Sequence, residues 1–284
     1  ASWNPDVTVN VLSNAQAVER ASFGIHAICT AAVEAGFTDL YRVYESNSDA
    51  QEDADLGDAT KAAIAAFYSQ SLHPKMVAVV KVVYASLATD LAAYLAAVPA
   101  AYEAYSYSCA DLTLAYQNAL ADWCLNNGKL AVVQSEDAAI LADTAGNLFE
   151  ILCDDDENGR AFGVYHDATE YAAVAWAAVG LSADPDQTAS VWYDKTLTGI
   201  TPEVITTAQK AAVISNNGNL VLPLLGVSAT GHGTLFDGNY IDTLISKDWL
   251  KARIGEAVAQ LKLDLSNRNQ KIPYTNAGLA MIEA

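Results

Sequence analysis

Paired helix-like and strand-like segments constrain the fold of this chain more than any other feature. In the first pair, a helix is predicted to begin with Asp58 as its N-cap and to stop at His73-Pro74. The run from Met76 to Val83 that follows is almost continuously apolar and β-branched, as in a strand covered on both faces. In the second pair, a helix over 111–127 precedes a strand over 129–134, and Gly128 is placed to cap the helix end.

The third pair reverses this order, with a strand over 160–165 before the helix. The sequence Asp167-Ala-Thr-Glu170 matches a capping box, which predicts a helix from there to Val179 that is closed by Gly180. A further helix is predicted over 86–98. Buried strands that alternate with helices predict an α/β fold in which a sheet and helices form layers.

The last third of the chain, from Trp192 to Thr275, is rich in turns and shows no spacing typical of a nucleophile with its base or of a metal site. Asp237-Gly238 between two apolar pairs predicts a β-hairpin. Ser246 is predicted to cap an amphipathic helix, within which Gly255 costs on the order of 1 kcal/mol relative to alanine. This stretch is typical of a protein that holds a shape and contacts copies of itself.

Near the N-terminus, Val7, Val9 and Val11 alternate with polar residues, which predicts a strand with one buried face. No hairpin partner lies nearby in the sequence, so the backbone groups of this strand must pair with a distant segment. That segment can belong to the same molecule or to a neighbouring one. The residues by themselves favour the first alternative.

The acidic composition limits the partners of the chain. Its 34 acidic residues outnumber 15 Lys and Arg, for a net charge of −19, whereas phosphate backbones are bound by basic side chains. Nucleic acid and anionic membranes are therefore excluded as expected partners. No apolar run is long enough to span a bilayer, and the N-terminal residues lack a secretory signal, so we expect a protein made in a cytoplasm.

The candidates for chemistry are weak, so no catalytic residue, metal ligand or cofactor is predicted. The half-motif Asp154-x-Asp156-x-Asn158-Gly159 resembles a calcium loop, but Tyr165 stands where the closing carboxylate is needed. The predicted strands are not followed by the glycine-rich turn that a dinucleotide requires. Four histidines (His26, His73, His166 and His232) are scattered, and four cysteines (Cys29, Cys109, Cys124 and Cys153) are interpreted as reduced core residues. A tyrosine cluster (Tyr102, Tyr105 and Tyr107) is interpreted as a partly buried helix end.

The order of the segments resembles that of contractile tail sheath proteins of bacteriophages, over nearly the whole chain. The N-terminal strand comes first and is followed by ten segments in the same order: Ala21–Gly24, Tyr41–Tyr44, Ala65–Gln70, the strand from Met76, Gly163–His166, Lys195–Pro202, Asn216–Asn219, Gly231–Asp242, Asp248–Leu250 and Lys271–Thr275.

This resemblance implies a layered α/β sheath core over 21–284, composed of one or two subdomains, preceded by a strand arm over 1–20. It implies a non-enzymatic subunit of a virion that stacks as six-fold rings around a tail tube and contracts to drive the tube through the host envelope. The implied partners are other copies of the chain and the tail tube, baseplate and tail terminator proteins. In this family terminal arms add strands to neighbouring subunits, which gives Val7, Val9 and Val11 an intermolecular partner.

One departure from the family concerns the C-terminus. Sheath proteins continue past the segment that matches Lys271–Thr275 with further strands and an arm, whereas this chain ends in a helix predicted from near Asn276. A C-terminal arm is therefore expected to be missing, either because the sequence is cut short or because the strands of neighbouring subunits join in a different way. The alternative functions are a soluble α/β enzyme or ligand-binding domain whose site is assembled from distant residues, and another virion component.

Overall fold

The computed structural model describes residues 23–154, 158–183, 185, 191–224, 226–273 and 275–283. The chain divides into two compact units, Ala21–Trp249 and Ala1–Arg20 with Leu250–Ala284, which are treated separately below. The predicted arm strand with Val7, Val9 and Val11 lies outside the described residues.

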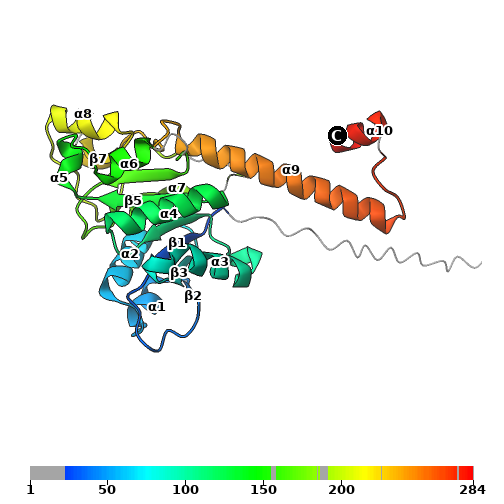
Figure 1. Cartoon of the computed structure of the whole chain (residues 1–284), viewed down its shortest axis with the longest axis horizontal. Helices are drawn as coiled ribbons and strands as arrows, with labels where there is room; N and C mark the ends of the chain where they lie inside the picture. Colours follow the sequence, from blue (N-terminus) through cyan, green and yellow to red (C-terminus); the bar gives the residue numbers. More distant parts are fainter. Residues whose placement is uncertain are drawn as a thin grey trace, which may run out of the picture. The chain divides into compact units, whose positions relative to one another are not determined.

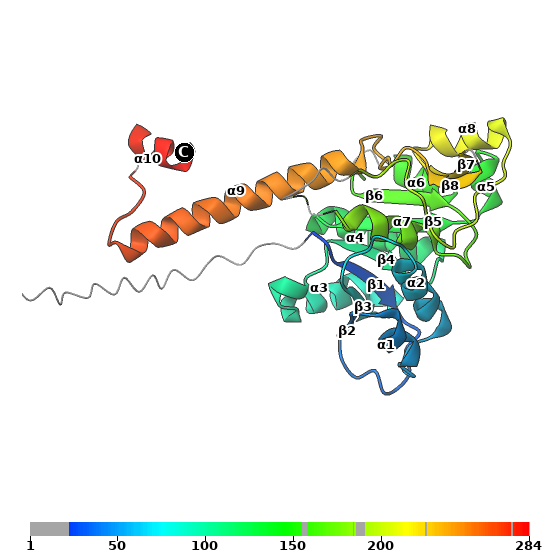
Figure 2. The ribbon, with the colours of Figure 1, turned by 180° about the vertical axis from the view of Figure 1, so that it is seen from behind.

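The larger unit is built on one eight-stranded sheet with the order β2-β3-β1-β4-β5-β6-β7-β8 (Figures 1 and 2). The six inner strands run parallel, and β2 and β8 are antiparallel strands at the two edges. The strands are β1 (His26–Thr30), β2 (Tyr41–Tyr44), β3 (Val77–Lys81), β4 (Ser106–Cys109), β5 (Leu130–Ser135), β6 (Ala161–Tyr165), β7 (Asn219–Leu224) and β8 (Val227–Thr230). The three strands predicted from apolar runs are β3, β5 and β6, so these predictions are confirmed.

Helices cover both faces of the sheet (Figures 1 and 2). Alternate residues of a strand point to opposite faces. On β5, Ala131 and Val133 pack in the cluster that contains α3, α4 and α6, whereas Leu130 and Val132 pack in the cluster that contains α7. The helices of this unit are α1 (Asn47–Glu52), α2 (Asp58–Tyr68), α3 (Leu87–Ala97), α4 (Leu114–Asn127), α5 (Ala138–Leu141), α6 (Leu148–Asp154), α7 (Ala172–Leu181) and α8 (Thr207–Ser215), and 3₁₀ turns lie at Tyr84–Ser86 and Ala100–Tyr102. The predicted layered α/β architecture is confirmed.

The interpretation of the tyrosine cluster as a helix end is wrong for Tyr107. This residue lies on β4, between β1 and β5, and its side chain is fully buried. Tyr105, directly before the strand, is also buried, whereas Tyr102 lies in a 3₁₀ turn and is partly exposed. The serines of β4 alternate with its apolar residues and masked the strand, because a strand covered on both faces usually reads as continuously apolar.

The predicted capping box of α7 is also wrong. The helix begins at Ala172, and its N-cap is Tyr171 in a left-handed conformation with φ 45°. The Asp167 carboxylate instead accepts hydrogen bonds from the backbone and hydroxyl of Thr169 in the preceding turn. All residues of α7 are buried, and the helix continues to Leu181, past the predicted stop at Gly180. A Cβ at Gly180 would collide with the ring of Trp192, so this glycine serves close packing.

Two other helix boundaries shift by a few residues. The N-cap of α2 is Gly57, and Asp58 is the first helical residue, where its charge still favours the positive end of the helix. The helix predicted over 111–127 begins at Leu114, after a turn in which the Asp111 carboxylate accepts from Thr113. Its predicted end is confirmed, because Gly128 adopts the left-handed conformation with φ 67°.

The predicted hairpin at Asp237-Gly238 is a tight turn with one antiparallel bridge, between Thr234 and Tyr240. Helix α9 (Ile241–Asn267) follows at once, so its predicted start at Ser246 is wrong. The side chains of Ile241 and Ile245 are buried in the core, and this packing extends the helix upstream of the local capping signal. The helix predicted from near Asn276 is confirmed as α10 (Asn276–Glu283). Within the described residues, no helix is long and apolar enough to cross a membrane.

Replacing Gly255 by alanine should stabilise α9. A Cβ at Gly255 would meet no atom within 4 Å, so the substitution adds helix propensity of about 1 kcal/mol without a clash. We expect amide hydrogen exchange in the surrounding turns of α9 to slow about fivefold. Gly128→Ala is the control, since its left-handed conformation strains alanine and should destabilise α4. Unchanged exchange in α9 would contradict the prediction.

Candidate assembly surface

The β7–β8 hairpin extends past the end of its neighbouring strand. Strand β7 pairs with β6 only through Asn219 and Leu220, but its pairing with β8 continues as far as Leu224. The hairpin therefore extends beyond the part of the sheet whose faces the helices cover. Within the described part of the chain, the outer residues of β7 pair with β8 alone. Unpaired strand edges are sites at which another segment can add to a sheet.

Among the described residues, both edges of this hairpin are bridged near its base, through Thr230 and Ala229 on one side and Val221 on the other, and no bridge reaches its tip. The backbone of Thr230 on β8 exchanges hydrogen bonds with Asp194 and Lys195, and on the other side the Glu203 N–H donates to the Val221 carbonyl. At the tip, Leu224 and Val227 are 53% and 51% exposed. The exposed apolar side chains lie where the backbone edge is least covered.

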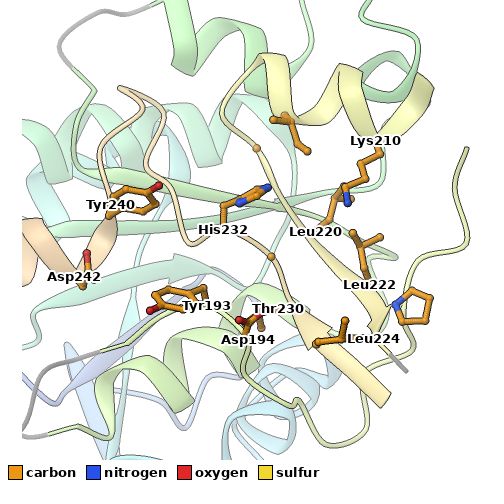
Figure 3. A pocket seen from close by; sticks show the side chains of 15 residues that line it. Tyr193, Asp194, Lys210, Leu220, Leu222, Leu224, Thr230, His232, Tyr240 and Asp242 are labelled. Atoms are coloured by element: carbon orange, nitrogen blue, oxygen red, sulfur yellow. The ribbon is translucent and has the colours of Figure 1, made fainter. Parts of the chain in front are cut away.

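One face of the hairpin forms the floor of a groove of about 710 Å³ (Figure 3). The floor is apolar, with Leu220, Leu222 and Leu224 of β7, and α8 contributes Ile214 and Lys210 to one wall. The other lining residues are Tyr193, Asp194, Gly218, Pro223, Ala229, Thr230, Gly231, His232, Tyr240 and Asp242. Leucines at every second position of a strand present one apolar surface, so this groove suits an extended chain with the same period.

Two polar groups of the groove accept hydrogen bonds from nearby backbone. The Thr230 hydroxyl accepts a hydrogen bond from the Lys195 N–H, and a carboxylate oxygen of Asp242 accepts from the Thr243 N–H. Tyr193 and Tyr240 are about half exposed at the rim. Side chains with one apolar and one polar end are common in protein interfaces. These exposed tyrosines make the rim of the groove similar to a protein-contact surface.

The sequence did not predict this groove, because Asn216–Asn219 was interpreted as a turn and the following strand was missed. A signal was available, since leucines at 220, 222 and 224 alternate with other residues. Pro223 inside the run argues against an inner strand, and the structure places it past the part of β7 that pairs with β6, opposite Ser228 of β8.

The weak candidates for metal sites remain apart. The structure shows no group of three or more His, Cys, Asp or Glu that could hold a metal among the residues it describes. Of the calcium half-motif, Asp156 lies outside those residues and Asp154 ends α6. Asn158 is buried, and its side-chain amide has no hydrogen-bond partner among the described residues.

His26 is a core residue rather than a ligand. It is fully buried on β1, and its Nδ1 and Nε2 lie 2.8 and 2.9 Å from the hydroxyls of Ser106 and Ser108 on β4. Burial lowers the pKa of His26 to about 3, so the ring is neutral at physiological pH. Cys29, Cys109 and Cys124 are likewise buried free thiols, and burial raises the pKa of each.

The structure assembles one polar cluster that the sequence did not predict. His166 is almost completely buried after β6, and its Nε2 lies 2.9 Å from Glu170 Oε2 and its Nδ1 lies 2.7 Å from Glu203 Oε1. The second contact has the distance of an ion pair without the angles of a hydrogen bond. The carboxylates that contact the ring belong to the turn before α7 and to the segment before α8.

A second such cluster joins the start of β6 to α9. Arg160 forms a bidentate ion pair with Asp248, with N···O distances of 2.7 and 2.8 Å. The Tyr105 hydroxyl donates a hydrogen bond to the same carboxylate at 2.8 Å. The hydrogen bond to Asp248 raises the pKa of Arg160, and burial followed by the Asp248 charge raises that of Tyr105. These contacts fix the first turns of α9 to the sheet.

The chain resembles proteins of known structure over its whole length. No family model and no curated protein matches the sequence. Among solved structures, the anti-feeding prophage helical sheath in its contracted state is 14% identical with a TM-score of 0.60, and the match covers 100% of this chain and 82% of that chain. This chain has the fold of a contractile sheath protein.

Two further structures have the same fold. The sheath complex of the extracellular contractile injection system PVC, in its contracted state, is 13% identical with a TM-score of 0.61, over 99% of this chain and 79% of that chain. A chain in the six-fold symmetrised anti-feeding prophage baseplate is 12% identical with a TM-score of 0.62, over 100% and 82%. The fold that the segment order implied is confirmed. At identities of 12% to 14%, the roles of individual residues are not transferred from these structures to this chain.

Proposed function

We propose that this chain is the structural subunit of a contractile sheath. Its copies stack as six-fold rings around a tube and contract to drive the tube through a cell envelope. The observation that carries the proposal is the match of the whole chain to most of the length of two sheath proteins. Those sheaths belong to an anti-feeding prophage and an extracellular injection system, so the particle is a phage tail or a tail-like injection machine.

The proposed subunit interacts by strand addition. The arm with Val7, Val9 and Val11 extends from one subunit and adds to the sheet of a neighbour. The β7–β8 groove supports this assignment of the acceptor, because it joins an apolar floor of alternate leucines to a partly open strand edge. Valines at every second position match that period, and backbone hydrogen bonds supply the affinity that a small apolar arm lacks.

The remaining partners follow from the same proposal. They are the tube that the sheath surrounds, the baseplate at one end and the terminator at the other, within an assembled particle. The net charge of −19 supports a sheath that does not contact the genome inside the tube. No catalysis is part of the proposed role, since the energy for contraction is held in the packing of the subunits.

Negative-stain electron microscopy of the concentrated protein tests this function. We expect tubes or six-fold rings, because sheath subunits associate head to tail into closed rings that stack. A monomer that stays monodisperse at high concentration, with the groove binding a small polar ligand, would overturn the proposal. That result would favour the alternative of a ligand-binding domain.

A further inference from the structure

Lys210 brings a positive charge to the wall of the groove. Within the described parts of the chain, it is the one Lys or Arg among the residues that line this groove. Figure 3 shows its side chain extending from α8 toward the strand that carries the floor leucines. Its backbone N–H donates to the carbonyl of Thr206, the N-cap, which forms a capping box with Gln209. Local hydrogen bonds therefore fix the point from which this lysine reaches into the groove.

The ammonium group of Lys210 has no ion-pair partner among the residues that the structure describes. Other basic side chains do pair there, such as Lys129 with Glu103 and Arg160 with Asp248. Acidic partners are abundant in this chain, which has 34 Asp and Glu against 15 Lys and Arg. A cation on the wall of an apolar groove that meets no carboxylate of its own subunit can bind one from an incoming segment.

The acidic side chains of the groove lie apart from this lysine. Figure 3 shows Asp194 and Asp242 separated from Lys210 across the groove. Hydrogen bonds hold both acids, since the Asp194 N–H donates to the Thr230 carbonyl and the Asp242 carboxylate accepts from the Thr243 N–H. The groove therefore has a basic side and an acidic side. A bound segment with one charge is favoured in the orientation that places its charge beside the opposite one.

The proposed arm carries one charged side chain, at the start of its valine run. Within residues 1–13 that side chain is Asp6, directly before the first of the three valines. In a strand, Asp6 shares a face with Thr8 and Asn10, and the valines occupy the opposite face. When the valines lie on the leucine floor, Asp6 points away from the floor. A long side chain such as Lys210 can reach over the strand from the wall and meet it there.

We propose that Lys210 selects the direction and register of the arm in the groove by pairing with Asp6 of a neighbouring copy. In the reverse direction the Asp6 carboxylate would leave the ammonium and lie nearer to Asp194 and Asp242, which repel it. A slip of one residue would turn the valines away from the floor, and a slip of two would move the carboxylate about 7 Å along the strand. This inference rests on the proposed function, in which the groove accepts the arm.

Binding of a synthetic peptide with the sequence of residues 1–13 to the dilute full-length protein tests the pair without assembly. The peptide carries a fluorophore, and its anisotropy at low ionic strength gives the Kd. The natural peptide and its Asp6→Lys form are each titrated with wild-type and Lys210→Glu protein. We expect each single reversal to raise Kd about tenfold, because a repulsion replaces an attraction. The two reversals together should bring Kd back to within about threefold of the natural pair.

Two controls separate the pair from a general effect of charge. Lys75→Glu makes the same change of net charge directly before β3, several strands away from β7, and should bind the natural peptide as the wild type does. Salt of about 1 M shortens the screening length to about 3 Å, so the differences between the four combinations should largely disappear. Lys75 and Lys210 are both exposed, so the urea midpoint of each variant should equal that of the wild type.

The result that decides the proposal is rescue by the double reversal. If the two reversals simply add, or if the natural peptide does not bind, the pair is refuted. Electron microscopy tests the sheath function separately. Rings or tubes of the wild type, together with effects that add, would support the sheath and refute the pair. Rescue in the peptide titrations without rings or tubes would support the pair and count against the sheath.

Discussion

Deletion of residues 1–13 is expected to abolish assembly while leaving the core folded. In the proposed contact, each of the three valines of the arm buries a side chain worth about 1.5 kcal/mol in the acceptor groove, or about 4.5 kcal/mol together. At about 1.4 kcal/mol for each factor of ten, their loss raises the concentration needed for assembly about a thousandfold. Light scattering and electron microscopy measure assembly, and urea denaturation measures the stability of the core.

A matched pair of variants controls for the length of the arm. Replacing Val7, Val9 and Val11 by serine removes the predicted apolar face and should reproduce the deletion. Replacing Thr8 and Asn10 by serine changes the opposite face and should leave assembly intact, since alternate residues of a strand point to opposite sides. If the deletion unfolds the core, the arm strand pairs within its own molecule. If the shortened protein assembles normally, the arm has no role in the contact.

Replacement of Asp248 by alanine should destabilise the larger unit by about 3 kcal/mol. The Arg160 and Asp248 side chains are 20% and 16% exposed, and removal of the carboxylate leaves the guanidinium and the Tyr105 hydroxyl without their shared partner. Breaking one side of a buried ion pair costs about 3 to 5 kcal/mol, and partial exposure places this pair at the lower end. The loss appears as a lower urea midpoint, followed by the fluorescence of the buried Trp176 and Trp192.

A second variant distinguishes loss of the ion pair from loss of packing. In Arg160→Met with Asp248→Leu both charges are removed together, and most of the stability should return because no buried charge is left unpaired. Lys247→Ala changes an exposed neighbour on α9 and should shift stability by less than about 0.5 kcal/mol. A urea midpoint for Asp248→Ala equal to that of the wild type would show that the pair does not anchor α9.

The local sequence predicted the core of the fold well and its boundaries less well. The apolar runs at β3, β5 and β6 are continuous because these strands are covered on both faces, and Gly128 marks the end of α4 because few other residues adopt its conformation. Strand β4 was missed because Ser106 and Ser108 interrupt its apolar pattern. Those serines face His26, and nothing near them in the sequence indicates that partner.

The candidate site depended on contacts that no local pattern specifies. The groove forms because β7 runs past β6 and packs beside α8, which is a consequence of strand order. The capping box at Asp167 was a reasonable prediction from spacing, but Glu170 instead binds His166 and Thr201 because these contacts are available in the folded chain. A side chain with two possible hydrogen-bond partners binds the one that tertiary packing brings within reach and shields from water.

The sequence by itself determined the α/β layers, the excess of acidic charge and the segment order that resembles contractile sheath proteins. Apolar residues that recur every two residues in a strand, or every 3.6 residues in a helix, indicate which face is buried. This information is contained in short stretches of the sequence. Only the tertiary structure decided the strand order, the open hairpin beside α8, the His166 cluster and the ion pair between Arg160 and Asp248. These features join residues far apart in the chain, and their geometry is fixed by the packing of whole elements against one another.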